Sequence, residues 1–181
     1  MDDPDPSFLT DLHQARRLMI IGQPGSGKSY LAAKLGDILG LPVVHIDKIH
    51  WQPGWVARES QVKMAMARDV HAQDAWIFEG GLFPTWEERL DRCHVLIWLD
   101  VPLFIRLWRI ARRTWQTYGT TRPDLAENCP ERVSLPFYRY VLRSRRAAHG
   151  RNTQFFAAAT KPKLRLRSAQ HVGDLLSRLT P

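Results

Sequence analysis

The residues best suited to chemistry stand early in the chain, in the run Gly22-Gln23-Pro24-Gly25-Ser26-Gly27-Lys28-Ser29. This run matches GxxxxGK[S/T] at every fixed position and lies between an apolar run and a helical pattern. Glycines let the backbone curl so that successive N–H groups point inward, and the positive end of the following helix also attracts phosphate. We therefore predict that a nucleotide such as ATP binds through Gly22, Pro24, Gly25, Ser26, Gly27, Lys28, Ser29 and the adjoining Tyr30.

The end of this loop also offers groups for a metal ion and for catalysis. Lys28 is expected to reach the outer phosphates, and the Ser29 hydroxyl is expected to ligate Mg²⁺, which prefers hard oxygen ligands. Two carboxylates end apolar runs, Glu79 and Asp100, and either could support the metal through water. Asp100 could equally be a charge placed ahead of the positive end of the next helix. Asp47, which follows another apolar run, is a candidate to accept a proton from an acceptor hydroxyl.

The second group of candidate functional residues consists of arginines. Four fall within one helical pattern and two bracket an irregular segment: Arg106, Arg109, Arg112, Arg113, Arg122 and Arg132. Spacings of three and four residues place Arg106, Arg109 and Arg113 on nearly one helical face, with Arg112 beside it. A guanidinium binds phosphate oxygens in pairs and can stack on a base, so a role at a triphosphate competes with the simpler interpretation of a solvated basic face.

The elements that must position these residues follow an alternating pattern. Apolar, strand-like runs at 18–21, 43–46, 76–78, 95–99 and 164–166 alternate with helical patterns at 28–39, 59–71, 84–92, 102–115, 131–148 and 169–179. Such alternation predicts a three-layer α/β fold, in which a parallel sheet is covered by helices on both faces. Two irregular segments, 47–58 and 117–130, are expected near the carboxyl ends of the strands, where open α/β sheets bind ligands.

Length, charge and composition limit the classes of protein to which the chain can belong. The chain has 181 residues, enough for one domain, and its acidic, proline-broken start and lack of a long apolar run predict a cytoplasmic protein without a membrane span. The two cysteines and seven histidines show no metal-site spacing. Residues 1–100 hold 10 Lys/Arg against 14 Asp/Glu, whereas residues 101–181 hold 16 against 4. The basic half should attract polyanions, either nucleoside triphosphate or nucleic acid.

The chain resembles the adenylate-kinase-like branch of P-loop kinases, and more closely the bacterial DNA topology modulation (FlaR-related) proteins. The resemblance is carried by the phosphate loop and by His45-Ile46-Asp47, Trp51-Gln52-Pro53-Gly54-Trp55, Trp76-Ile77-Phe78-Glu79-Gly80, Leu99-Asp100-Val101-Pro102, Arg122-Pro123-Asp124 and Cys129-Pro130-Glu131-Arg132. It implies a five-stranded parallel sheet, an acceptor-binding segment at about 47–75 and an arginine-bearing lid at about 114–132.

By the same resemblance, Arg109 would lie against the adenine, and Arg112 or Arg113 would close on the phosphates together with Arg122 and Arg132. The chain departs from adenylate kinases after the third strand, where Glu79-Gly80-Gly81-Leu82-Phe83 replaces Asp-Gly-Phe-Pro-Arg. The arginine that would grip a nucleoside monophosphate is therefore missing at this position.

The leading hypothesis is phosphoryl transfer from MgATP to a small acceptor held near Asp47, His50, Trp51 and Trp55, with lid closure excluding water. Its catalytic residues would be Lys28, Asp47, Arg113, Arg122 and Arg132. The two tryptophans could instead simply pack their segment onto the core. Two further hypotheses are an ATP-dependent nucleic-acid-binding protein, suggested by the basic half and Arg143-Ser144-Arg145-Arg146, and a simple ATPase.

Overall fold

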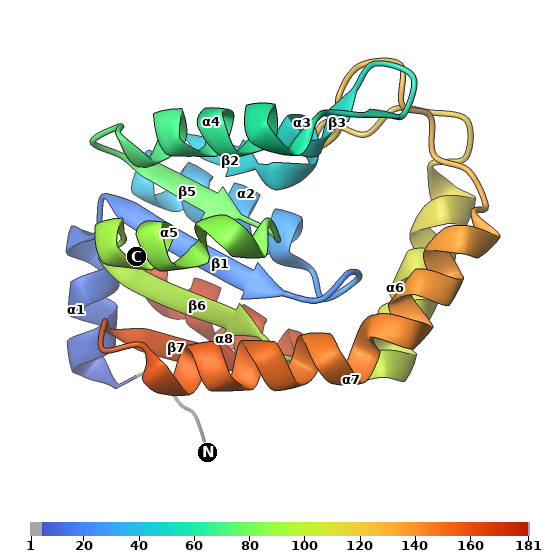
Figure 1. Cartoon of the computed structure of the whole chain (residues 1–181). Helices are drawn as coiled ribbons and strands as arrows, with labels where there is room; N and C mark the ends of the chain where they lie inside the picture. The colour runs from blue at the N-terminus through green and yellow to red at the C-terminus, as the bar shows by residue number, and fades with distance from the viewer. Residues whose placement is uncertain (1–4, 181) are drawn as a thin grey trace.

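Five parallel strands form the centre of the computed structural model, which describes residues 5–180 (Figure 1). They are β1 (Arg17–Gly22), β2 (Val43–His45), β5 (Trp76–Glu79), β6 (Val95–Leu99) and β7 (Lys163–Leu166), in the order β2-β5-β1-β6-β7. All four pairings are parallel, which confirms the predicted sheet. Most of the acidic start used to predict a cytoplasmic protein, residues 1–4, lies outside the described residues.

The strand register brings the chemically active residues to one edge of the sheet. Gly22 pairs with Leu99 at the end of β1, and His45 pairs with Glu79 at the end of β2 and β5. Because the strands are parallel, their carboxyl ends meet at the same edge. The phosphate loop, Glu79 and the start of the segment after β2 therefore lie together.

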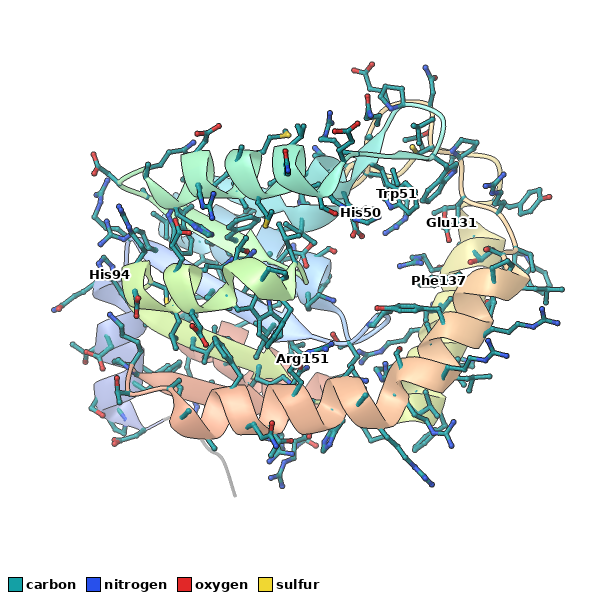
Figure 2. The ribbon with its side chains drawn as sticks, viewed as in Figure 1. His50, Trp51, His94, Glu131, Phe137 and Arg151 are labelled. Atoms are coloured by element: carbon teal, nitrogen blue, oxygen red, sulfur yellow. The ribbon has the colours of Figure 1, made fainter. Side chains whose placement is uncertain are left out.

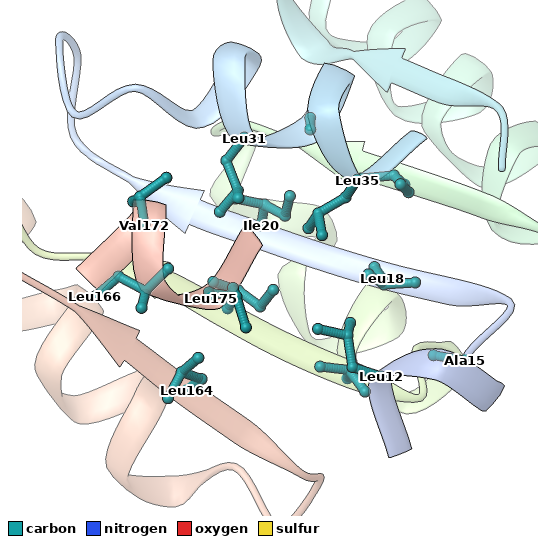
Figure 3. Packing of buried hydrophobic residues seen from close by; sticks show 14 of the residues in the cluster. Leu12, Ala15, Leu18, Ile20, Leu31, Leu35, Leu164, Leu166, Val172 and Leu175 are labelled. Atoms are coloured by element: carbon teal, nitrogen blue, oxygen red, sulfur yellow. The ribbon is translucent and has the colours of Figure 1, made fainter. Parts of the chain in front are cut away.

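Helices cover both faces, because side chains of successive strand residues point to opposite sides. One face packs against α1 (Pro6–Gln14), α2 (Lys28–Leu39) and α8 (Ala169–Leu179), where Leu18 and Ile20 meet Leu31, Leu35 and Leu175 (Figure 3). The opposite face packs against α3 (Ile46–His50), α4 (Ser60–His71), α5 (Trp86–Arg92) and the carboxyl-terminal part of α7 (Leu135–Ala158). This arrangement confirms the predicted three layers.

The two irregular segments have their own local structure. The first contains α3 and a short antiparallel hairpin of β3 (Trp51–Gln52) and β4 (Val56–Ala57). The second, the lid segment, connects α6 (Leu103–Gln116) to α7 and is pinned by bridges between Tyr118 and Glu131 and between Thr121 and Pro130. Figure 1 shows the hairpin and the lid segment side by side at one end of the molecule.

Several predicted boundaries were wrong. The helix expected at 131–148 begins only at Leu135, because Glu131 pairs within the lid segment and the Ser134 side chain caps the helix by accepting from the Phe137 amide. The same helix runs on to Ala158. The helix expected at 84–92 is divided into a 3-10 turn, Phe83–Thr85, and α5, while α1 and α3 were not predicted.

Candidate functional site

The phosphate loop connects β1 to α2 through backbone shapes that require glycine. Gly25 has φ 78°, and a Cβ there would come within 2.6 Å of the Arg106 carbonyl oxygen. Ser26 is fully buried, and its hydroxyl oxygen has no hydrogen-bond partner among residues 5–180. The Lys28 Nζ donates to the Gln23 carbonyl at 3.4 Å, across the loop. A curled backbone, a buried hydroxyl without a partner and a helix N-terminus together fit a bound phosphate.

Glu79 joins the phosphate loop to β2. The carboxylate is 3% exposed, and its Oε1 accepts from the Ser29 hydroxyl at 2.9 Å and lies 2.9 Å from His45 Nδ1. The described residues contain no group of three or more His, Cys, Asp or Glu side chains suited to a metal ion. Mg²⁺ is commonly held by one or two protein oxygens, with phosphate oxygens and water completing the shell. Ser29 and Glu79 fit such a metal.

Asp100, the other carboxylate considered for the metal, has different partners. It accepts a hydrogen bond from Arg165, and its Oδ1 lies 3.3 Å from His149 Nε2. Within the described part of the chain, the carboxylate that contacts Ser29 is thus Glu79. The geometry favours Glu79 over Asp100 as the metal-supporting group.

Asp47 lies in the first turn of α3, partly buried. Burial raises the pKa of Asp47 above its usual range, and the charge of Glu79 raises it further. The positive charges of Lys28 and Arg122 lower the same pKa. Asp47 follows His45, which pairs with Glu79, so it lies at the edge of the sheet that carries the phosphate loop.

The arginines of α6 contact the phosphate loop, the lid segment or the surface. Arg109 Nη1 donates to the Ser26 carbonyl at 2.8 Å, and Arg106 Nη1 donates to the Pro24 carbonyl at 3.2 Å. Arg112 is exposed and its guanidinium lies 5.2 Å from the centre of the Trp108 ring. Of the two arginines predicted to bind the nucleotide, the structure brings Arg109 to the loop and gives Arg112 a surface stack instead.

Glu131 organises the lid segment, and the sequence interpretation gave it no role. This buried carboxylate accepts from Arg122 Nε at 2.8 Å, from the Thr114 hydroxyl at 3.0 Å and from Arg113 Nη2 at 3.4 Å. Arg122 also donates to Asp124 at 2.8 Å. Two of the predicted catalytic arginines are thus oriented by one acid. The sequence signal that could have identified Glu131 is the scarcity of acidic residues around it, since residues 101–173 contain only three.

The lid segment contacts the hairpin of β3 and β4, which carries Trp51 and Trp55. Trp55 Nε1 donates to the Pro130 carbonyl at 3.0 Å, and the Gly54 amide donates to the Asn128 carbonyl at 3.0 Å. Arg132, which was predicted to close on the phosphates with Arg122, lies over the Trp55 ring with its guanidinium 6.0 Å from the ring centre. Figure 2 labels Trp51 of the hairpin and Glu131 of the lid segment at this end of the molecule. The hairpin and the lid segment are therefore joined to each other by hydrogen bonds.

Arg89 is a second residue that the sequence did not reveal. Its guanidinium is fully buried, lies 3.7 Å from the centre of the Phe78 ring, and donates to the carbonyls of Gly80 and Gly81. Burial lowers the pKa of Arg89 to about 9. The arginine fixes the turn that follows β5, next to Glu79. Its position within an ordinary charged helical pattern gave no hint of this burial.

Comparisons with known proteins agree with the architecture. No family model matches the chain, and no curated protein sequence matches it. Among solved structures, shikimate kinase from Acinetobacter baumannii in complex with shikimate has a TM-score of 0.57 at 15% identity, covering 94% of each chain. A gluconokinase from Sinorhizobium meliloti 1021 has a TM-score of 0.54 at 14% identity, covering 90% of each chain. Deoxyadenosine kinase from M. mycoides with bound dATP has a TM-score of 0.54 at 12% identity, covering 90% of this chain and 96% of that one.

These identities show the fold alone, and that fold is the P-loop, nucleoside-monophosphate-kinase-like one predicted from the sequence. The resemblance to the DNA topology modulation proteins stays a prediction. Across residues 5–180, every helix is too short or too polar to span a bilayer.

Proposed function

We propose that this protein transfers the terminal phosphoryl group of MgATP to the hydroxyl of a small acceptor in the cytoplasm. The observation that carries the proposal is the geometry of the phosphate loop, where the buried Ser26 hydroxyl has no partner among residues 5–180 and the Ser29 hydroxyl donates to the buried Glu79 carboxylate at 2.9 Å. Asp47 is proposed as the proton acceptor, because it lies in the first turn of α3, directly after β2, whose His45 lies 2.9 Å from the Glu79 carboxylate. The solved kinases named above share the fold and support the same class of reaction.

In the proposed reaction, the acceptor oxygen forms a bond to the γ-phosphorus while the bond to the β,γ-bridging oxygen breaks, leaving ADP. Asp47 receives the proton of the acceptor hydroxyl. Lys28, Arg113 of α6 and Arg122 of the lid segment stabilise the charge on the transferred group. When bound at Ser29 and Glu79, Mg²⁺ would neutralise phosphate charge. The hairpin and lid segment exclude water, which would otherwise compete with the acceptor.

Arg109 is proposed to lie against the base, because its contact with the Ser26 carbonyl keeps it beside the phosphate loop. Trp51 and Trp55 pack edge to face with ring centres 5.3 Å apart, and we propose that they form one wall of the acceptor site. An acceptor with an apolar face and a reactive hydroxyl would suit this wall.

The test is a screen of nucleosides, nucleotides, sugars and small acids for acceptor-stimulated ADP release. Lys28→Ala should lower the stimulated rate by at least about a hundredfold, since the ammonium group acts on the transferring phosphate. Lys34→Ala, an exposed change in the same helix, is the matched control and should retain the rate. ADP release that no acceptor stimulates would contradict the proposal and favour a simple ATPase.

A second candidate function, nucleic-acid binding, is favoured by the surface of α6 and α7. These helices carry four and five arginines respectively, and neither contains an aspartate or glutamate. Several large apolar side chains are exposed among them: Phe104, Trp108, Trp115, Leu135 and Tyr140. Aromatic rings interleaved with arginines are typical of surfaces that bind single-stranded nucleic acid.

Fluorescence anisotropy with a labelled single-stranded oligonucleotide tests this second candidate. Trp115, 86% exposed, should matter most, so Trp115→Ala should weaken binding about tenfold. Val62→Ala, which removes an exposed apolar side chain outside the two helices, should leave binding unchanged. Absence of binding at low salt would exclude this function.

A further inference from the structure

A cavity of about 400 Å³ lies beside the phosphate loop. Its wall is assembled from Gln23 of the loop, the start of α6, the middle of α7 and Arg167, which follows β7. Among the described residues, none of those lining the cavity belongs to the cluster of Ser29, Glu79 and Asp47. A cavity of this size can hold a small ligand.

The lining is strongly basic. Its charged and titratable members are Arg106, Arg145, Arg146, Arg167, His149 and Asp100. The single carboxylate, Asp100, is already engaged by Arg165 and lies 3.3 Å from His149. The arginines therefore outweigh the acidic charge, and the cavity should attract anions.

Arg106 supplies a second, independent observation that points to a ligand. It is 2% exposed, and although its Nη1 donates to the Pro24 carbonyl, its Nε has no hydrogen-bond partner within residues 5–180. A buried guanidinium nitrogen without an acceptor is unfavourable, and an anionic oxygen would satisfy it. Burial lowers the pKa of Arg106, which an anion in the cavity would oppose.

We propose that this cavity is a second anion site, separate from the phosphate loop, which binds a small phosphate-bearing molecule. The planar fork of arginine suits the oxygens of a phosphate group, and several arginines together suit its double charge. The site is also joined to the loop, because Gln23 Nε2 donates to the Arg145 carbonyl at 2.9 Å and Arg106 holds Pro24. Ligand and nucleotide should therefore change each other's affinity by the same factor. Since both are anions, each should weaken the other.

The proposal is tested by calorimetric titration of inorganic phosphate into the full chain, first saturated with MgADP, at constant ionic strength. We expect saturable binding of one phosphate per chain while the loop is filled. Arg146→Ala should weaken this binding at least tenfold. Arg143→Ala, three residues earlier on α7 and absent from the cavity lining, should leave it within twofold. Lys28→Ala, titrated without nucleotide, should still bind phosphate in the cavity.

Four results would overturn the proposal. They are no saturable binding once the loop is filled, equal losses in Arg143→Ala and Arg146→Ala, loss of all binding in Lys28→Ala, and one-for-one displacement of phosphate by MgADP. The last result would assign the cavity to the nucleotide's own phosphates. None of these outcomes depends on phosphotransfer activity, so the site and the proposed function can fail independently.

Discussion

Replacing Glu131 by glutamine should release the lid segment from α6. A hydrogen bond to a charged group contributes about 1.5–3 kcal/mol when it is buried. The Arg122–Glu131 contact at 2.8 Å joins side chains only 13% and 8% exposed, so it should fall in this range. The Arg113 contact, at 3.4 Å with an arginine 32% exposed, should contribute about 0.5 kcal/mol. Because an amide oxygen can still accept from Thr114, the expected net loss is about 2 kcal/mol.

A loss of about 2 kcal/mol corresponds to roughly thirtyfold more frequent opening of the lid. Native-state hydrogen exchange can measure this at the Gly119 amide, which donates to the Glu131 carbonyl at 2.9 Å, and at the Gly54 amide, which donates to Asn128. Glu127→Gln removes an exposed charge from the same segment and is the control. If exchange of these amides in Glu131→Gln stayed within twofold of the control, the view of Glu131 as the organiser of the lid would be wrong.

Three further changes probe the site. Glu79→Gln should raise the Mg²⁺ concentration for half-maximal activity at least about tenfold, whereas Asp100→Asn should change it less than twofold; a magnesium titration giving the reverse order would refute this assignment. Burial raises the pKa of Asp47 above 3.8, so the charged carboxylate destabilises the folded chain at pH 7. Asp47→Asn should therefore increase the free energy of unfolding at pH 7, and this gain should disappear as the pH falls to 3.8. Urea unfolding across this pH range measures the difference. Gly80→Ala should lower the free energy of unfolding by about 2–4 kcal/mol in the same assay. Gly80 has φ 113°, and a Cβ there would lie 2.2 Å from a neighbouring side chain. Gly81→Ala is the control, because a Cβ at Gly81 would meet open space.

Local sequence patterns account for much of the fold. Residues 28–39 and 169–179 were predicted as helices with the bounds that the structure shows, because glycine or a capping side chain ends or begins the periodic pattern. The phosphate loop was evident from eight consecutive residues, since its chemistry depends on backbone shape and a following helix. The five strands followed from apolar runs that only a sheet covered on both faces can bury.

The composition of the rest of the site was decided by contacts between segments far apart in the chain. From the sequence, Glu79 and Asp100 were equally good candidates to support the metal ion. In the folded chain, Glu79 contacts Ser29, whereas Asp100 contacts Arg165. Glu131 stands at the start of a predicted helical pattern, and its pairing with Arg122 joins it to an irregular segment. The contact between the lid segment and the hairpin joins two irregular segments. Periodicity reports which face of an element is buried, but it carries no information on which distant side chain will meet that face, and only the tertiary structure supplies that partner.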